Sequence, residues 1–129
     1  MNLDALATRL QAKNCGIVAE SIFIGELPED NRNAILLMGP YRGTPVNQEL
    51  RGYYISNFRL VARSSDYGQG LALAKQASDA LDSLVDYALP GMLVRQCLPV
   101  NLPRPYRRSV GGYWEFEVDM EIVFVDTAA

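Results

Sequence analysis

The chain has 129 residues, 49% of them hydrophobic and 21% charged, with a formal net charge of -3 at pH 7 and a pI near 4.9. The acidic balance argues against whole-surface attraction to nucleic acid or anionic membranes, and no apolar run reaches the roughly 18 residues of a membrane-spanning helix. Length and composition predict a single domain, residues 1–129, around one hydrophobic core.

Hydrophobic periodicity and turn residues divide the chain into two helices and five strands. In chain order, the pattern predicts a helix over residues 3–12, strands over 17–27, 34–38 and 53–63, a helix over 67–88, and strands over 92–100 and 113–125. Asn2 is the expected N-cap of the first helix, and Ser64 or Ser65 that of the second. Two long loops, residues 39–52 and 101–112, complete the prediction.

Glycines stand unusually close to the start of the second predicted helix, at Gly68 and Gly70. Each costs about 1 kcal/mol of helix stability relative to alanine. We therefore expect them to allow a close approach of the helix to the sheet.

The last predicted strand has the most regular pattern in the chain. Apolar side chains at even positions from Trp114 to Phe124 alternate with acidic side chains at the odd positions from Glu115 to Glu121, so that one face packs and the other meets water or a partner. At about 3.3 Å per residue the strand would be about 43 Å long, whereas a compact chain of this size has a radius of gyration of about 14 Å. Such a strand must curve, bulge or project.

The order of elements is α-β-β-β-α-β-β, with the strands grouped in hairpins. Strands and helices that are segregated in this way favour an α+β fold: a mainly antiparallel sheet of about five strands with the long helix on one face.

Enzymatic chemistry finds little support. The chain has no histidine, which removes the commonest general base and every Ser-His or Cys-His nucleophile system. Its glycines follow no phosphate-binding spacing, and Cys15 and Cys97 stand alone, as expected of free, partly buried thiols. We therefore expect no catalytic residue, no metal site and no cofactor.

The residues at the N-terminus lack the basic start of a signal peptide, so we expect synthesis and retention in the host cytoplasm.

The acidic row on the last strand is the sharpest polar group. It consists of Glu115, Glu117, Asp119 and Glu121. Alternate positions lie about 6.6 Å apart and do not converge on one point, as ligands of Mg²⁺ or Ca²⁺ must. We expect a solvated face paired across strands to Arg59 or Arg95; an acidic surface used in assembly is the alternative.

Two loops carry residue types that are common at protein interfaces. The first set is Tyr41, Arg42, Glu49 and Arg51 in the 39–52 loop, which is either an assembly arm or a merely exposed loop. The second is Arg104, Tyr106, Arg107 and Arg108 in the 101–112 loop. This basic set suits a protein interface, an exposed loop without a special role, or contacts with phosphates and bases in a small nucleic-acid-binding module.

The segment NFRLVARSSDYGQGLALAKQASDAL, residues 57–81, is a strand that enters a helix through a polar turn with Asp66 and Tyr67. With the Pro-bounded strand and the long aromatic and acidic strand that follow, it resembles small tail-completion proteins of long-tailed bacteriophages. Within that group it is most similar to the tail terminator family, whose members are often labelled minor tail proteins.

The resemblance implies a structural virion protein at the head-proximal end of the tail. Members form a homohexameric ring that caps the tail tube, stops its polymerisation and offers a surface to the head-neck connector. The implied partners are further copies of the chain, the major tail tube protein and the connector protein, with no membrane and with DNA only passing through the lumen. Another neck or connector ring subunit is the alternative within the same class.

Overall fold

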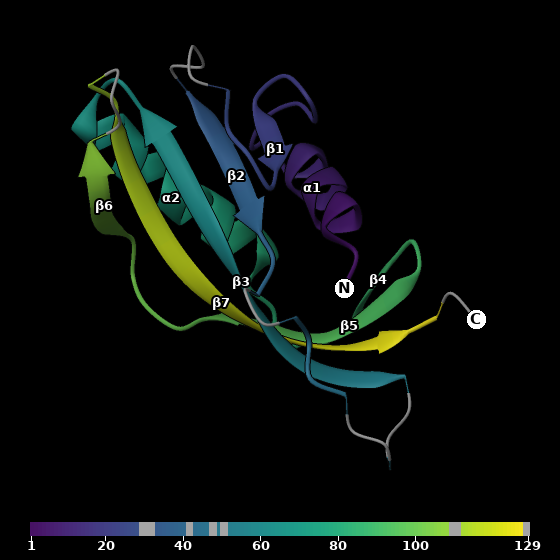
Figure 1. The fold of residues 1–129 in the computed structure, drawn as a ribbon. Coiled ribbons are helices and arrows are strands. Elements are labelled where there is room, and N and C mark those ends of the chain that lie inside the picture. Colours follow the sequence, from purple (N-terminus) through teal and green to yellow (C-terminus); the bar gives the residue numbers. More distant parts are fainter. Residues whose placement is uncertain (29–32, 41–42, 47–48, 50–51, 109–111, 128–129) are drawn as a thin grey trace.

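The computed structural model describes the whole chain except residues 29–32, 41–42, 47–48, 50–51, 109–111 and 128–129, and except the side chains of residues 106–108. It is an α+β fold in which one mixed, mostly antiparallel sheet carries two helices (Figure 1). The elements are α1 (Leu3–Ala12), β1 (Ile22–Ile24), β2 (Ala34–Met38), β3 (Tyr53–Ser64), α2 (Tyr67–Leu81), β4 (Tyr87–Leu89), β5 (Met92–Pro99), β6 (Arg104–Arg108) and β7 (Trp114–Asp126).

The sheet has the order β1-β2-β3-β7-β5-β4, with β6 also paired to β7. Among the strands of the described residues, β1 and β2 run parallel and the other neighbours are antiparallel. The long β3–β7 pair, from Tyr53↔Val125 to Ser64↔Trp114, forms the spine of the sheet. Figure 1 shows that β7 bends along its length, as its predicted span requires.

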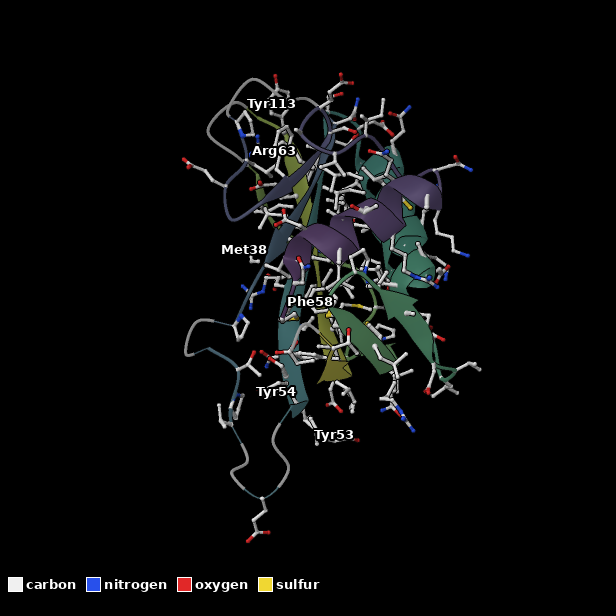
Figure 2. All side chains as sticks on the ribbon, turned by 90° about the vertical axis from the view of Figure 1, so that its right-hand side faces the viewer. Met38, Tyr53, Tyr54, Phe58, Arg63 and Tyr113 are labelled. Atoms are coloured by element: carbon white, nitrogen blue, oxygen red, sulfur yellow. The ribbon has the colours of Figure 1, made fainter. Side chains whose placement is uncertain are left out.

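The predicted alternation of the last strand is confirmed. Even-numbered side chains of β7 point into the core with those of β3, where Phe116, Val118, Met120 and Ile122 are fully buried. Both helices pack against this inner face and contribute Leu6, Leu10, Ala74 and Leu81 to the same core cluster. Figure 2 shows Met38 and Arg63 on the opposite side of the sheet from α2. We call that side, which carries the odd-numbered side chains of β3 and β7, the outer face.

Gly70 and Gly68 differ in what surrounds them. A Cβ added to Gly70 would lie 2.9 Å from Cε2 of Phe116, which confirms that this glycine allows α2 to approach the sheet. A Cβ on Gly68 would meet only Oδ2 of Asp66, at 3.4 Å. The prediction is therefore wrong for Gly68. Asp66 is the N-cap of α2, and its Oδ2 accepts from the backbone N–H of Gln69 at 2.9 Å, in place of Ser64 or Ser65.

Three predicted boundaries were wrong. The strand expected over residues 17–27 is reduced to β1, because the chain turns tightly before it, with Ala19 at a φ of 69°, and at Gly25 after it. The second helix ends at Leu81 because Asp82 is extended and Ser83 exchanges backbone hydrogen bonds with Cys97. Residues of the predicted loop 101–112 form β6, which adds to the edge of β7.

Candidate assembly surfaces

The outer face carries a buried ion pair next to the start of β7. Arg63 on β3 lies directly opposite Glu115 in the strand register, and its Nε and Nη2 donate to Oε2 of Glu115 at 3.3 and 3.1 Å. Nη1 of Arg63 donates to the carbonyl of Pro28 at 2.8 Å. Both side chains are less than a tenth exposed. The pair therefore joins β3, β7 and the end of the segment that follows β1.

Two further arginines share the next two carboxylates of the row. Arg59 on β3 contacts Asp119 at 3.0 Å and Glu117 at 3.4 Å, and Arg104 on β6 contacts Glu117 at 2.6 Å and Asp119 at 3.0 Å. The hydrogen bond to Glu117 is the main reason why the pKa of Arg104 lies above its ordinary value. We call these six residues, Arg59, Arg63, Arg104, Glu115, Glu117 and Asp119, the charged network.

The charged network corrects the expected solvated face. Glu115 and Glu117 are buried, and three of the four carboxylates in the row are paired to arginines; Glu121 alone is exposed. The predicted pairing to Arg59 is present. Arg95 instead contacts Asp86, because it lies at the irregularity of the β5–β7 register between Val94 and Gln96.

Arg63 and Arg104 were missing from the predicted pairing of the row. Arg63 has the same parity as Arg59 on its strand, so the sequence indicates that both side chains lie on the same face. The sequence does not give the strand register, which places Arg63 opposite Glu115. Arg104 was predicted in a loop, and its pairing required the unexpected strand β6. Because Arg104 is committed to two carboxylates, it offers less positive charge for a nucleic acid than its sequence suggests.

Asn101 fills the gap between β5 and β6 along the edge of β7. Its Oδ1 accepts from the backbone N–H of Asp119 at 2.9 Å, and its Nδ2 donates to the carbonyl of Glu117 at 3.3 Å. The side chain thus replaces the backbone groups that a continuous strand would supply. It also fixes the turn from which Leu102, which is 79% exposed, projects.

The other predicted interface residues are placed only in part. Tyr41, Arg42 and Arg51 lie outside the described residues, and Glu49 is exposed. The backbone of Tyr106, Arg107 and Arg108 belongs to β6, where Arg107 pairs with Glu115 and Arg108 with Trp114 in the register. Their side chains lie outside the described part of the chain. Of the two predicted sets, the fully described members are Arg104, on β6 beside the start of β7, and Glu49, in the segment between β2 and β3.

The half of the outer face beyond the charged network begins with the polar pair Asn57 and Glu121 and is apolar from there on. Ile55 lies opposite Val123, and Tyr53 opposite Val125, in the β3–β7 register. Ile55 is 58% exposed. Since large exposed apolar groups on a small domain mark interaction surfaces, this half is a candidate contact with another protein.

The part of the chain that the structure describes holds no group of three or more His, Cys, Asp or Glu side chains arranged to bind a metal. Its helices include none that is long and apolar enough to span a bilayer. Cys15 and Cys97 are free, as predicted, and both are buried where partial burial was expected.

Comparisons with known proteins agree with the resemblance seen in the sequence. The chain is similar in structure to a chain of the "Virion of native gene transfer agent (GTA) particle", with a TM-score of 0.68 and 15% identity, over 95% of this chain and 92% of that one. None of the curated proteins matches its sequence. Residues 9–126 match the family described as "Bacteriophage tail terminator protein". The chain therefore belongs to the bacteriophage tail terminator family, whose proteins are structural components of the phage tail.

Proposed function

We propose that the protein forms a homohexameric ring that caps the tail tube, ends its polymerisation and provides the surface that joins the tail to the head. The ring would lie at the head-proximal end of the virion tail, after assembly in the cytoplasm of the bacterial host. Its partners would be its own copies, the major tail tube protein and the head-neck connector protein. The family match over residues 9–126 is the observation that carries this proposal.

The structure supports a contact between copies through the outer face. Both helices lie on the inner face, so the apolar half around Ile55 and Val123 stays without a helix over it (Figure 1). A contact between two different surfaces of the same chain closes into a ring when its rotation divides the circle. A chain with exposed apolar groups and strand edges has the parts that such a contact needs.

We propose an assembly role for the acidic row as well. If the row faced the lumen of the ring, its repulsion of passing DNA would be weak, because Glu115, Glu117 and Asp119 are each paired to an arginine. Paired charges instead define a rigid polar surface that can select one orientation of a neighbouring subunit.

Electron microscopy of phage that lack the protein tests the capping function. We expect overlong tails beside unattached heads. Tails of normal length with leaking heads would contradict it and would support a connector ring on the head side. Mass measurement of the native assembly tests the hexamer separately.

A nucleic-acid-binding module is the alternative function. It would require salt-dependent binding of DNA or RNA, and the slope of the binding constant against salt concentration should fall when an arginine of residues 104–108 is replaced.

A further inference from the structure

The solvent-facing side of α2 is apolar over its first two turns. The segment from residue 67 to residue 74 contains no charged residue. Tyr67 and Leu71 are 44% and 39% exposed. Four exposed residues repeat there at the helical spacing of three and four and so share one side of the helix. We call them the α2 patch: Tyr67, Gly68, Leu71 and Ala72.

The α2 patch is rigid and lies beside α1. α1 packs against the C-terminal half of α2, where Nε of Arg9 donates to the carbonyl of Ala80 at 3.3 Å. At the N-terminal half, the ring of Tyr67 packs edge-on against Trp114 and Phe116, with centroid distances of 5.1 and 4.9 Å. An exposed apolar surface that the core holds in place is typical of a contact with another protein.

The described residues give Gly68 no packing role of its own. Glycine inside a helix costs about 1 kcal/mol relative to alanine. At Gly70 the close approach to Phe116 explains the glycine, whereas a Cβ at Gly68 would meet Oδ2 of Asp66 at 3.4 Å, an ordinary contact distance. Gly68 also lies within α2, so its backbone conformation suits any residue. A partner that approaches the backbone of α2 at Gly68 would supply the missing reason.

A rigid apolar turn follows the other end of α2. Leu84 and Val85 are 75% and 74% exposed. The hydroxyl of Ser83 accepts from the N–H of Val85 at 3.0 Å and donates to its carbonyl at 2.6 Å. The N–H and the carbonyl of Ser83 pair with Cys97 at 2.7 and 2.9 Å. Because the turn is already ordered, a partner that covers it loses little free energy to immobilisation. We call residues 82–86 the apolar turn.

The apolar turn also carries a carboxylate that is unfavourable in its own chain. Asp82 is the C-cap of α2, the negative end of the helix dipole, and the last turn of the helix contains no basic residue. Asp82 is exposed and forms no ion pair with the described basic residues. The positive N-terminal end of another α2 would suit this carboxylate better. Lys75, which is 66% exposed, lies one turn beyond Leu71 and adds positive charge there.

We propose that the apolar turn of one copy packs on the α2 patch of a second copy. Its two apolar side chains would pack against Leu71 and reach the helix backbone at Gly68. Asp82 would then lie beside Lys75 of the second copy. The contact adds to the one through the outer face, because α2 lies on the inner side of the sheet. The inference rests on the proposed ring and names a contact that would close it.

The two surfaces lie apart on one chain, as a head-to-tail contact requires. At about 1.5 Å per residue, Gly68 and Leu81 are about 20 Å apart along the helix axis. The apolar turn begins after Leu81. One copy can therefore present its apolar turn while its own α2 patch receives that of the next copy.

Disulfide trapping between two variants of the full chain tests the contact. Copies with Ala72→Cys are mixed with copies that carry Val85→Cys under mild oxidation; the natural Cys15 and Cys97 are buried. The matched control pairs Val85→Cys with Thr8→Cys, an exposed position on α1. We expect the first mixture to cross-link about tenfold faster or more, because a specific contact raises the local concentration of the two thiols.

Gly68→Ala distinguishes a contact role from a structural one. In the Ala72→Cys copy, the added methyl should lower cross-linking about tenfold, since it holds the partner away from the helix. The same change should leave the single chain at least as stable as before. Asp82→Lys in the Val85→Cys copy should also lower cross-linking, and Lys75→Asp in the other copy should restore it.

Equal cross-linking of the test and control mixtures at about 1 mM protein, where a Kd as weak as about 1 mM gives substantial binding, would overturn the contact. Preferential cross-linking of Ala72→Cys copies with one another would overturn it too, because two α2 helices would then face each other. Tail length separates this failure from failure of the proposed function. If deletion of the protein gives overlong tails but the mixture does not cross-link selectively, the capping function stands and this contact does not. If it cross-links as described and deletion leaves tails of normal length, the contact stands and the capping function fails.

Discussion

Arg63 and Glu115 are paired across the two longest strands of the sheet, and the guanidinium of Arg63 uses three nitrogens to reach Glu115 and the carbonyl of Pro28. Both side chains are nearly buried, so removing one of them leaves a charge without its partner in a poorly hydrated position. The ion pair of Arg63 and Glu115 on the outer face therefore contributes to the stability of the fold.

Replacing Arg63 by alanine should lower the free energy of unfolding by about 3 kcal/mol, because Glu115 is left buried and unpaired. The double variant Arg63→Met with Glu115→Leu should lose less than the single variant, since neither charge remains. Chemical denaturation measures both. Lys75→Ala, which breaks the exposed pair of Lys75 with Asp79, is the control and should change stability by less than about 1 kcal/mol. Equal losses in the single and double variants would contradict the argument.

Gly70→Ala and Gly68→Ala should have opposite effects on stability. The added Cβ at Gly70 would lie 2.9 and 3.0 Å from two ring carbons of Phe116 and 3.3 Å from Cβ of Ser64. Overpacking of this kind costs about 1–3 kcal/mol, which exceeds the gain in helix propensity of about 1 kcal/mol. At Gly68 the added Cβ has enough space, so the gain in helix propensity should exceed the cost of packing. Thermal unfolding of the two variants checks the prediction, and stabilisation by Gly70→Ala would contradict it.

Much of this fold followed from side-chain periodicity. The alternation in β7 needs no knowledge of its neighbours, because burial of every second side chain is a property of any half-covered strand. The α+β class followed in the same way from the grouping of strands. The close approach of α2 to the sheet at Gly70 was expected because glycine lowers helix stability, so a glycine inside a helix must have another advantage.

Partners across the sheet could not be predicted because they depend on register. Arg59 and Arg63 have the same parity, and only the pairing of β3 with β7 shows which carboxylate each one meets. The end of α2 was missed for a similar reason. Residues after Leu81 continue the helical spacing, but Ser83 gains two backbone hydrogen bonds to Cys97 on another strand.

Alkaline pH should destabilise the protein through Cys97. Burial raises the pKa of its thiol from an ordinary 9.0 to about 12. Between these two pKa values the unfolded chain loses the thiol proton while the folded chain keeps it. The contribution of Cys97 to the free energy of unfolding is therefore fully present below pH 9 and falls as the pH rises above 9. The slope approaches about 1.4 kcal/mol per pH unit for one group.

Urea denaturation at pH 8, 9 and 10 measures this slope, which should flatten in Cys97→Ala. Burial also raises the pKa of the neighbouring Tyr87, whose ordinary value of 10.0 places its effect at higher pH. Tyr87→Phe should therefore keep the decline that begins at pH 9. An unchanged slope in Cys97→Ala would assign the decline to other groups.

Asn101→Ala should destabilise the junction of β5, β6 and β7. The variant leaves the N–H of Asp119 and the carbonyl of Glu117 without the side chain that binds them, and each poorly hydrated, unsatisfied group costs about 1–3 kcal/mol. Water at this partly exposed edge should restore some of the loss, so we expect a net change of about 2 kcal/mol in the free energy of unfolding.

Amide exchange distinguishes this local effect from a general loss of stability. The N–H of Asp119 should exchange faster in Asn101→Ala than in the wild type, by more than the global change explains, while amides in the β2–β3 ladder should follow the global change. Asn57→Ala is the control, because the Asn57 side chain is exposed and makes no hydrogen bond to the described residues. If the Asp119 amide stays as protected as in the wild type, the backbone of β7 is held at this point by something other than Asn101.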